Sequence, residues 1–159
     1  MVSRTLVQTI EDNSEHISAR IVRHLREDPR LEHLRSLPES ELQDRAREVV
    51  KNLGHWLVAG HDGEIAQHYE RLGRRRQEES IPLHELVHSL HILREHIVDF
   101  VREEGIGQSA FQLYAEEELE HLVGLFFDKA VYHAVRGYEG AMHQVAHAPH
   151  VDLRGGALA

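Results

Sequence analysis

The chain has 159 residues, the size of a single domain, and its 41% hydrophobic and 28% charged residues are proportions typical of a soluble globular protein. The formal charge of −9 argues against a nucleic-acid binder, which needs a basic face, and the absence of cysteine excludes disulfides, thiolate metal sites and cysteine nucleophiles. Because no apolar run reaches the length of a membrane span and the N-terminus lacks a signal-peptide core, we expect a cytoplasmic protein without membrane or nucleic-acid partners.

Helical periodicity of the apolar residues predicts an all-α fold, a single-domain bundle of about five helices. The first helix covers residues 2–27 and ends near Asp28-Pro29, because proline cannot continue the backbone hydrogen bonds of a helix. Residues 30–37 form a connector with a helical turn. Ser36-Leu37-Pro38-Glu39 then supplies a cap and a first-turn proline to a second helix, which ends at Gly60.

A third helix follows the turn at His61-Asp62-Gly63 and runs to about Glu79. Its last turns carry Arg74, Arg75 and Arg76, the concentrated basic patch of the chain. Two interpretations stay open for this patch. The arginines complement the negative end of the helix dipole and pair with nearby acids, or they dock a partner or an anion.

Residues 81–101 show the strongest helical pattern, and we expect the other helices to pack around this segment. Ser80 suits the capping position and Pro82 the first turn, while Gly105 and Gly107 end the helix. Ile92 is the one large aliphatic residue predicted to lie opposite the apolar face. That face consists of Leu83, Leu86, Val87, Leu90, Leu93, Ile97, Val98, Phe100 and Val101.

The same helix carries a row of polar residues beside its apolar face. His84, His88, His91 and Glu95 follow one another at steps of four, three and four. His84-Glu85-x-x-His88 matches the zinc-protease signature, in which two histidines bind zinc and the glutamate activates the metal-bound water. Such a hydrolase also needs a third metal ligand and the edge of a β-sheet to hold the peptide substrate, and the sequence contains no strand pattern. With 15 histidines in the chain we interpret the match as accidental and expect no enzymatic activity.

Three non-hydrolytic sites are alternatives. A divalent metal would bind two histidines one turn apart together with a further ligand from the same or the last helix. A di-iron centre would use the two Glu-x-x-His motifs, and a haem would use the same histidines. Surplus surface histidine is the simplest explanation of the same pattern. The residues concerned are His84, Glu85, His88, His91, Glu95, Glu118 and His121.

The last helical segment covers about residues 108–145 and contains Gly124 and Gly137. These glycines predict a bend or split, or a close approach by a neighbouring helix. The periodicity fails after His143, so we expect a helical domain over residues 1–142 and a flexible tail over 143–159. The histidines of this tail, His143, His147 and His150, would bind a divalent ion only if the tail is helical.

Several stretches together resemble one known family. They are Asn52-Leu53-Gly54-His55-Trp56-Leu57, His68-Tyr69-Glu70-Arg71-Leu72-Gly73-Arg74-Arg75-Arg76, Ile81-Pro82-Leu83-His84-Glu85-Leu86-Val87, Leu90-His91-Ile92-Leu93-Arg94, Phe126-Phe127-Asp128-Lys129-Ala130 and Tyr138-Glu139. On these residues the chain resembles the N-terminal domain of the RsbRD type of RsbT co-antagonists, from the first helix to about residue 142.

The resemblance implies a non-catalytic helical sensory or regulatory module of bacterial stress signalling, globin-like as in related stressosome proteins and usually dimeric. Such domains typically precede a STAS domain or a histidine kinase, and the chain shows neither after its last helix. We therefore expect a homodimer that passes its signal to a separate output protein, a STAS-domain protein or a kinase. The family pattern does not reserve the positions of His84, His88 and His91 for histidine.

Overall fold

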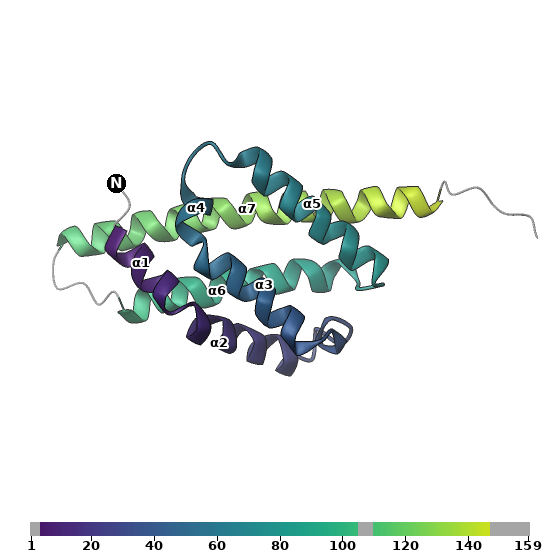
Figure 1. Ribbon diagram of the computed structural model, residues 1–159, viewed down its shortest axis with the longest axis horizontal. Helices are drawn as coiled ribbons and strands as arrows, with labels where there is room; N and C mark the ends of the chain where they lie inside the picture. The colour runs from purple at the N-terminus through teal and green to yellow at the C-terminus, as the bar shows by residue number, and fades with distance from the viewer. Residues whose placement is uncertain (1–3, 105–109, 147–159) are drawn as a thin grey trace, which may run out of the picture.

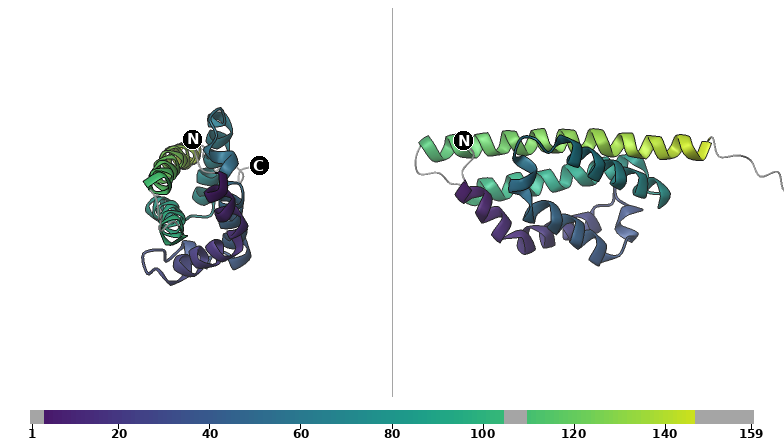
Figure 2. Two further views of the ribbon diagram at one scale, coloured as in Figure 1. Left: turned by 90° about the vertical axis from the view of Figure 1, so that its left-hand side faces the viewer. Right: turned by 45° about the horizontal axis from the view of Figure 1, so that its top comes forward.

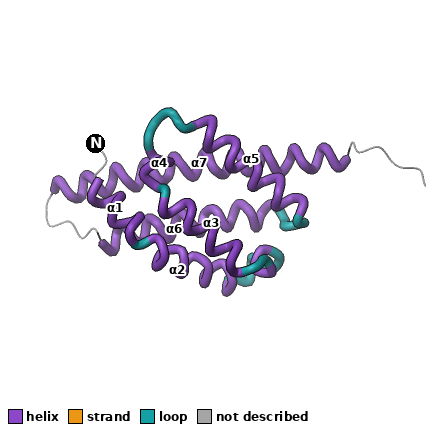
Figure 3. The backbone as a smooth tube through the Cα atoms, viewed as in Figure 1, coloured by secondary structure: helices purple, strands orange, loops and turns teal. Residues whose placement is uncertain are grey.

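The computed structural model describes residues 4–104 and 110–146. Within these ranges the chain forms seven α-helices and one 3-10 turn and contains no strand, so the predicted all-α bundle is confirmed (Figures 1 and 3). The elements are α1 (Arg4–Asp12), α2 (Ser14–Glu27), the turn η1 (Leu34–Ser36), α3 (Glu39–Lys51), α4 (Leu53–Leu57), α5 (Asp62–Glu78), α6 (Leu83–Glu104) and α7 (Ala110–Ala146).

The helix count exceeds the predicted five because two predicted helices are each divided at an asparagine. Asn13 separates α1 from α2, and Asn52 separates α3 from α4. In both cases the side-chain Nδ2 donates to the carbonyl oxygen four residues earlier, at 2.7 Å to Thr9 and at 2.8 Å to Glu48. The same carbonyl also accepts the backbone N–H of the asparagine, at 3.2 Å and 3.3 Å, so the side chain adds a second donor to it at the point where the chain changes direction.

Ser80 does not cap α6, contrary to the prediction. It has a φ of 60°, in the left-handed region, and its N–H donates to the carbonyl of Gln77 while the next N–H, of Ile81, donates to that of Arg76. These bonds close the C-terminal end of α5. The helix α6 begins at Leu83, after Pro82.

The helix α6 lies at the centre of the fold, as predicted. It contacts α1, α2, α5 and α7, and it runs beside α7 in all views of the molecule (Figures 1 and 2). Because α6 has neighbours on more than one side, its buried surface is wider than one face. Ile92, predicted opposite the apolar face, is fully buried.

The longest helix, α7, is unbroken at Gly124 and Gly137, so the prediction of a bend or split there is wrong. Gly137 instead permits the close approach that was the other interpretation. A Cβ atom at Gly137 would lie 2.1 Å from the carbonyl oxygen of Glu70, and one at Gly73 would lie 1.9 Å from that of Ala134. The backbones of α5 and α7 therefore touch directly, which no larger residue at either position would allow.

The C-terminal part of α7 projects past the other helices (Figure 1). This helix includes His143, which we assigned to the tail, whereas Gly105, Gly107, His147 and His150 lie outside the described residues. Nearer the centre, the Tyr138 hydroxyl donates to the Ile81 carbonyl at 2.7 Å and ties α7 to the α5–α6 connection. None of the helices in the described ranges combines the length and apolarity that a bilayer crossing requires.

Candidate functional site

A band of polar side chains, here named the polar seam, lies between α6 on one side and α2 with its following connector on the other. Two carboxylates of this band, those of Asp28 and Glu85, are buried, and buried carboxylates are uncommon in a small helical protein, so the band is a candidate for function. The members of the seam are His24, Asp28, Arg30, His33, Glu85, His88 and His96.

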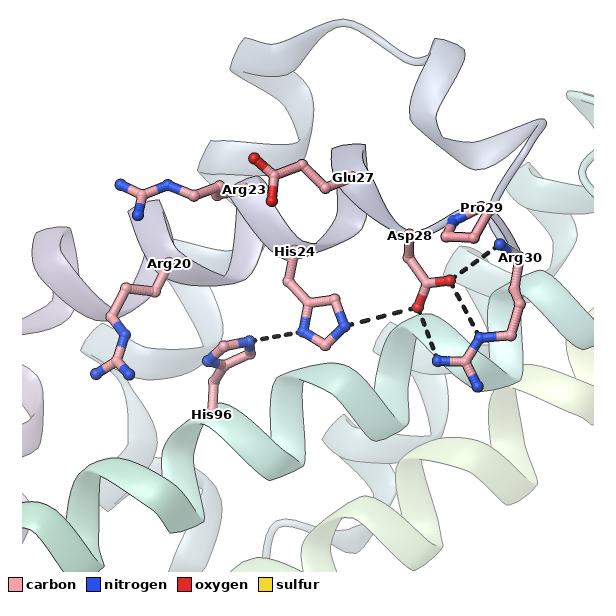
Figure 4. Close-up of a pocket in the computed structure, with 8 residues that line it drawn as sticks. All are labelled: Arg20, Arg23, His24, Glu27, Asp28, Pro29, Arg30 and His96. Carbon is pink, nitrogen blue, oxygen red and sulfur yellow. Dashed lines mark hydrogen bonds and ion pairs between the residues drawn. The ribbon is translucent and has the colours of Figure 1, made fainter.

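Asp28 is the centre of the seam (Figure 4). It follows the last residue of α2, where Pro29 ends the helix, and its side chain is only 4% exposed. Its oxygens accept bonds from the backbone N–H and the guanidinium of Arg30, at 2.9 to 3.1 Å, and contact the His88 Nε2 at 2.9 Å. The bonds from Arg30 outweigh burial and, with His88, hold the pKa of Asp28 well below its ordinary value.

Two histidines extend the seam towards the middle of α6 (Figure 4). The Nδ1 of His24 lies 2.9 Å from the Nε2 of His96, and the Nε2 of His24 lies 3.6 Å from Asp28. One ring nitrogen of the His24–His96 contact must donate and the other accept, so the two facing nitrogens share one proton. Burial lowers the pKa of His96, and the neighbouring His24 and Arg20 act in the same direction.

An open hollow of about 600 Å³ adjoins this end of the seam (Figure 4). Arg20 at its edge is paired with Glu103, at 3.1 Å, whereas Arg23 has no ion pair within the described ranges. The hollow is lined by Arg20, Arg23, His24, Glu27, Asp28, Pro29, Arg30 and His96.

Glu85, the glutamate of the zinc-protease signature, is 1% exposed and faces the connector. Its Oε1 accepts the backbone N–H groups of His33 at 2.8 Å and Leu34 at 3.3 Å, and its Oε2 lies 2.8 Å from the His33 Nδ1. The carboxylate thus holds the start of η1 in place. In this position its oxygens are used within the protein, which is the opposite of what a base for a metal-bound water requires.

The other members of the predicted row lie on the outer side of α6. His84 is exposed and His91 half-buried, and with Leu83, Val87 and His88 they line a shallow hollow of about 600 Å³. Glu95 is exposed one turn further along. Only His88 of the row bonds to a seam residue, Asp28. The use of these side chains as ligands for a divalent metal or a haem stays a prediction.

The structure does not bring the second Glu-x-x-His motif to the first. Glu120, beside His121, pairs with Arg102 at 3.0 Å, and Arg102 lies about 20 Å from His88 along the α6 axis at 1.5 Å per residue. Glu118 and His121 therefore lie at the opposite end of α6 from Glu85 and His88, too far to share a di-iron centre in this arrangement.

The basic patch divides into buried and exposed arginines. Arg76 is 3% exposed, and its Nη1 lies 3.1 Å from Glu41 and 2.8 Å from Glu79. Arg75 pairs with the same two carboxylates, at 3.1 and 2.9 Å. Arg74 is exposed and has no ion pair within the part of the chain that the structure describes. The patch serves mainly to join α5 to α3, and Arg74 alone keeps the docking interpretation open.

Sequence reasoning missed five members of the seam, namely His24, Asp28, Arg30, His33 and His96. The spacing of His24 and Asp28, four residues apart at the end of a predicted helix, was a visible signal for a pair on one helix face. His96 carried no such signal, because its partner lies seventy-two residues away. From the sequence, Asp28 was interpreted only as the residue near which the first helix ends.

One protein-family model, described as the RsbT co-antagonist protein rsbRD N-terminal domain, matches residues 15–151. This range includes the polar seam, the basic patch and the stretches on which the resemblance was noted. The comparisons with curated proteins and with solved structures give no match.

Proposed function

The chain belongs to the family of RsbT co-antagonist protein rsbRD N-terminal domains, and from this premise we propose that it is a non-catalytic regulatory domain of stress signalling that acts by binding. The burial of Glu85 supports a role without catalysis, because the one motif that suggested hydrolysis uses its glutamate to hold the connector.

The observation that carries the proposal is the outer face of α7. Large apolar side chains are exposed along the whole helix, from Phe111 at 83% to Val145 at 65%. At 100° per residue, Phe111, Tyr114, Leu125 and Tyr132 fall within one narrow stripe. Large apolar side chains that are exposed on one side of a helix mark an interaction surface more often than apolar residues scattered singly. Three further exposed apolar residues of α7 lie on another side of the helix and are not part of this stripe, namely Leu113, Met142 and Val145.

We assign this stripe to a second copy of the chain. A two-fold dimer buries the same patch on both subunits, so one stripe on one helix is sufficient. The length of α7 supports this assignment, because a long helix lets two copies bury area without rearranging the bundle. In this arrangement the output protein, a STAS-domain protein or a kinase as the family suggests, would contact surfaces outside the stripe, with Arg74 as a docking residue.

We propose that the domain receives its signal at the polar seam. The seam is formed by α2 and α6, and α6 in turn packs against α7. A change in the protonation or ligation of the seam would alter how α2 lies on α6, and α6 would transmit that change to the dimer helix. The signal itself is either a proton or a small molecule that occupies the hollow beside His24 and His96.

The dimer is tested by light scattering coupled to gel filtration on the protein and on Leu125→Glu and Tyr132→Glu. We expect a dimer for the unmodified chain and a monomer with unchanged helical content for both variants. Val58→Glu is the matched control, since Val58 is 60% exposed but lies outside α7. A monomeric unmodified chain, or dimers that tolerate both charges, would contradict the proposed interface.

A further inference from the structure

Three metal-ligating side chains meet away from the polar seam, where α4 is joined to α5. His55 lies on α4, His61 immediately precedes α5, and Glu64 lies in the first turn of α5. The Glu64 Oε2 lies 3.0 Å from the His55 Nε2 and 3.2 Å from the His61 Nδ1. The two imidazole rings are 4.1 Å apart between centroids, and one ligand atom from each of the three residues lies within 4.8 Å of the others.

The short connection between the two helices is held in place at both ends. On the α4 side, Trp56 is buried next to His55, and the backbone N–H of Gly54 donates to the Glu11 carboxylate at 2.8 Å. Gly60 has a φ of 100°, a conformation that favours glycine and that turns the chain back towards His55.

On the α5 side, Ile65 is buried, and Asp62 pairs with Lys129 of α7 at 2.8 Å. The three ligand residues therefore lie between segments that contact α1 and α7. A site whose ligands are positioned by the fold loses less conformational entropy on binding an ion than three free side chains would.

We propose that His55, His61 and Glu64 form a binding site for a divalent transition-metal ion of the Zn²⁺ class. Two imidazole nitrogens and one carboxylate oxygen are a donor set that suits Zn²⁺ or its neighbours, and not Mg²⁺ or Ca²⁺, which prefer oxygen alone. A tetrahedral ion with bonds of about 2.1 Å holds its ligand atoms about 3.4 Å apart. The distances of 3.0 and 3.2 Å need to open by only a few tenths of an ångström.

The three proposed ligand side chains are accessible to solvent. The side chains of His55, His61 and Glu64 are 45%, 31% and 54% exposed, so an ion reaches them from solvent and keeps a water molecule in the fourth position. Within the described ranges Glu64 bonds to no other residue than these two histidines. The bound ion would join α4 to α5 and so reinforce the contacts of α4 with α1 and α7.

The test is a calorimetric titration of Zn²⁺ into untagged protein freed of metal with a chelator. We expect His55→Ala, His61→Ala and Glu64→Gln each to weaken the tightest binding step at least tenfold. The matched control replaces His84, His88 and His91 together with alanine, which removes three histidines of α6 and leaves the proposed ligands intact. In this control the tightest step stays within twofold of the unmodified protein.

A second measurement keeps the proposal independent of folding defects. Zn²⁺ raises the unfolding temperature of a protein whose folded state binds it more tightly than the unfolded chain does, so the rise is expected in the unmodified chain and in the α6 control and is absent from His61→Ala. Circular dichroism shows whether each variant is folded. The proposal is overturned if folded His55→Ala and His61→Ala bind Zn²⁺ as the unmodified chain does. It is equally overturned if only the α6 variant loses binding.

Discussion

Glu85 and His33 are joined twice, although they lie fifty-two residues apart in the chain: one carboxylate oxygen accepts the backbone N–H of His33 at 2.8 Å and the other lies 2.8 Å from its ring. Glu85→Ala would leave two backbone N–H groups without their acceptor. We expect it to destabilise the protein by about 2–3 kcal/mol in chemical denaturation, since an unsatisfied polar group costs about 1–3 kcal/mol. Glu95→Ala, at an exposed site on the same helix, should change stability by less than about 0.5 kcal/mol.

The same pair of variants separates the structural role of Glu85 from a catalytic one. A catalytic glutamate would be replaceable without loss of stability, and its replacement would abolish a chelator-sensitive hydrolysis. Unchanged stability of Glu85→Ala together with the loss of such an activity would contradict our assignment.

Asp28 should support stability at all but strongly acidic pH. Its pKa is lowered in the folded state, chiefly by Arg30, so its contribution is complete above the ordinary pKa of about 3.9 and is lost as the pH falls below it. We expect Asp28→Asn to cost about 1–3 kcal/mol at pH 7 and to lose less stability than the unmodified chain between pH 4 and pH 2.5. Asp44→Asn, which removes an exposed pair with Arg47, is the control and should cost under about 0.5 kcal/mol.

His96 should make stability depend on pH between about pH 7.5 and 5.5. Burial lowers its pKa in the folded state, as it does that of His68, so the unfolded chain takes up protons first and stability falls as the pH drops through about 6.5. The charged groups that face His96 are His24, Arg20, Asp99 and Glu95. Urea unfolding of His96→Gln should show a shallower dependence than the unmodified chain. An equal slope in both, or the same effect from exposed His84→Gln, would count against the seam as a proton-sensitive element.

The contact between α5 and α7 should not tolerate a single added methyl group. Gly73→Ala and Gly137→Ala would each place a Cβ about 2 Å from a backbone oxygen, so the helices must move apart, and we expect a loss of about 3 kcal/mol or more. Gly140→Ala lies on the same helix with open space around it and should stabilise by about 0.5–1 kcal/mol through helix propensity. Thermal unfolding of the three variants distinguishes packing from propensity.

The arginines of the basic patch should differ sharply in their effect on folding. Arg76→Ala leaves the carboxylates of Glu41 and Glu79 without a buried partner, and we expect a cost of about 3 kcal/mol. Arg74→Ala should leave the free energy of unfolding within about 0.5 kcal/mol, because Arg74 is exposed. If Arg74→Glu weakens binding of an output protein while the fold is intact, the docking role is supported. Equal destabilisation by Arg74→Ala and Arg76→Ala would contradict the division of the patch.

The amphipathic patterns were sufficient to predict the all-α class and the central place of α6, because both depend on residues that are neighbours on one helix. The breaks at Asn13 and Asn52 were missed, since the apolar pattern runs through both positions and carries no signal for the bond from each asparagine side chain to the backbone. Gly137 left two opposite interpretations, and only the position of Glu70 on another helix decided between them. The periodicity of apolar residues describes one helix by itself, whereas the close approach at Gly137 depends on the neighbouring helix.

The polar groups were harder to predict for the same reason. The row from His84 to Glu95 was correctly placed on one helix. The roles of His88 in this row and of the neighbouring Glu85 nevertheless depend on partners elsewhere, Asp28 for His88 and His33 for Glu85. His55, His61 and Glu64 come together only because the turn at Gly60 brings α4 back to α5. His61 and Glu64 are three residues apart, a spacing found on any helix, and nothing in the sequence joins His55 to them, so no sequence rule singled the three out.

The direct backbone contact at Gly73 and Gly137 fixes the position of α7 against α5 at one point. No flexible side chains separate the two helices there, so α7 cannot slide along α5 without a clash, although it can tilt about this point. The part of α7 before this contact is long and carries the stripe from Phe111 to Tyr132. The part after it is short and projects from the bundle (Figure 1). If the angle at which α6 meets α7 changed, α7 would therefore be displaced least at this contact and most at its two ends.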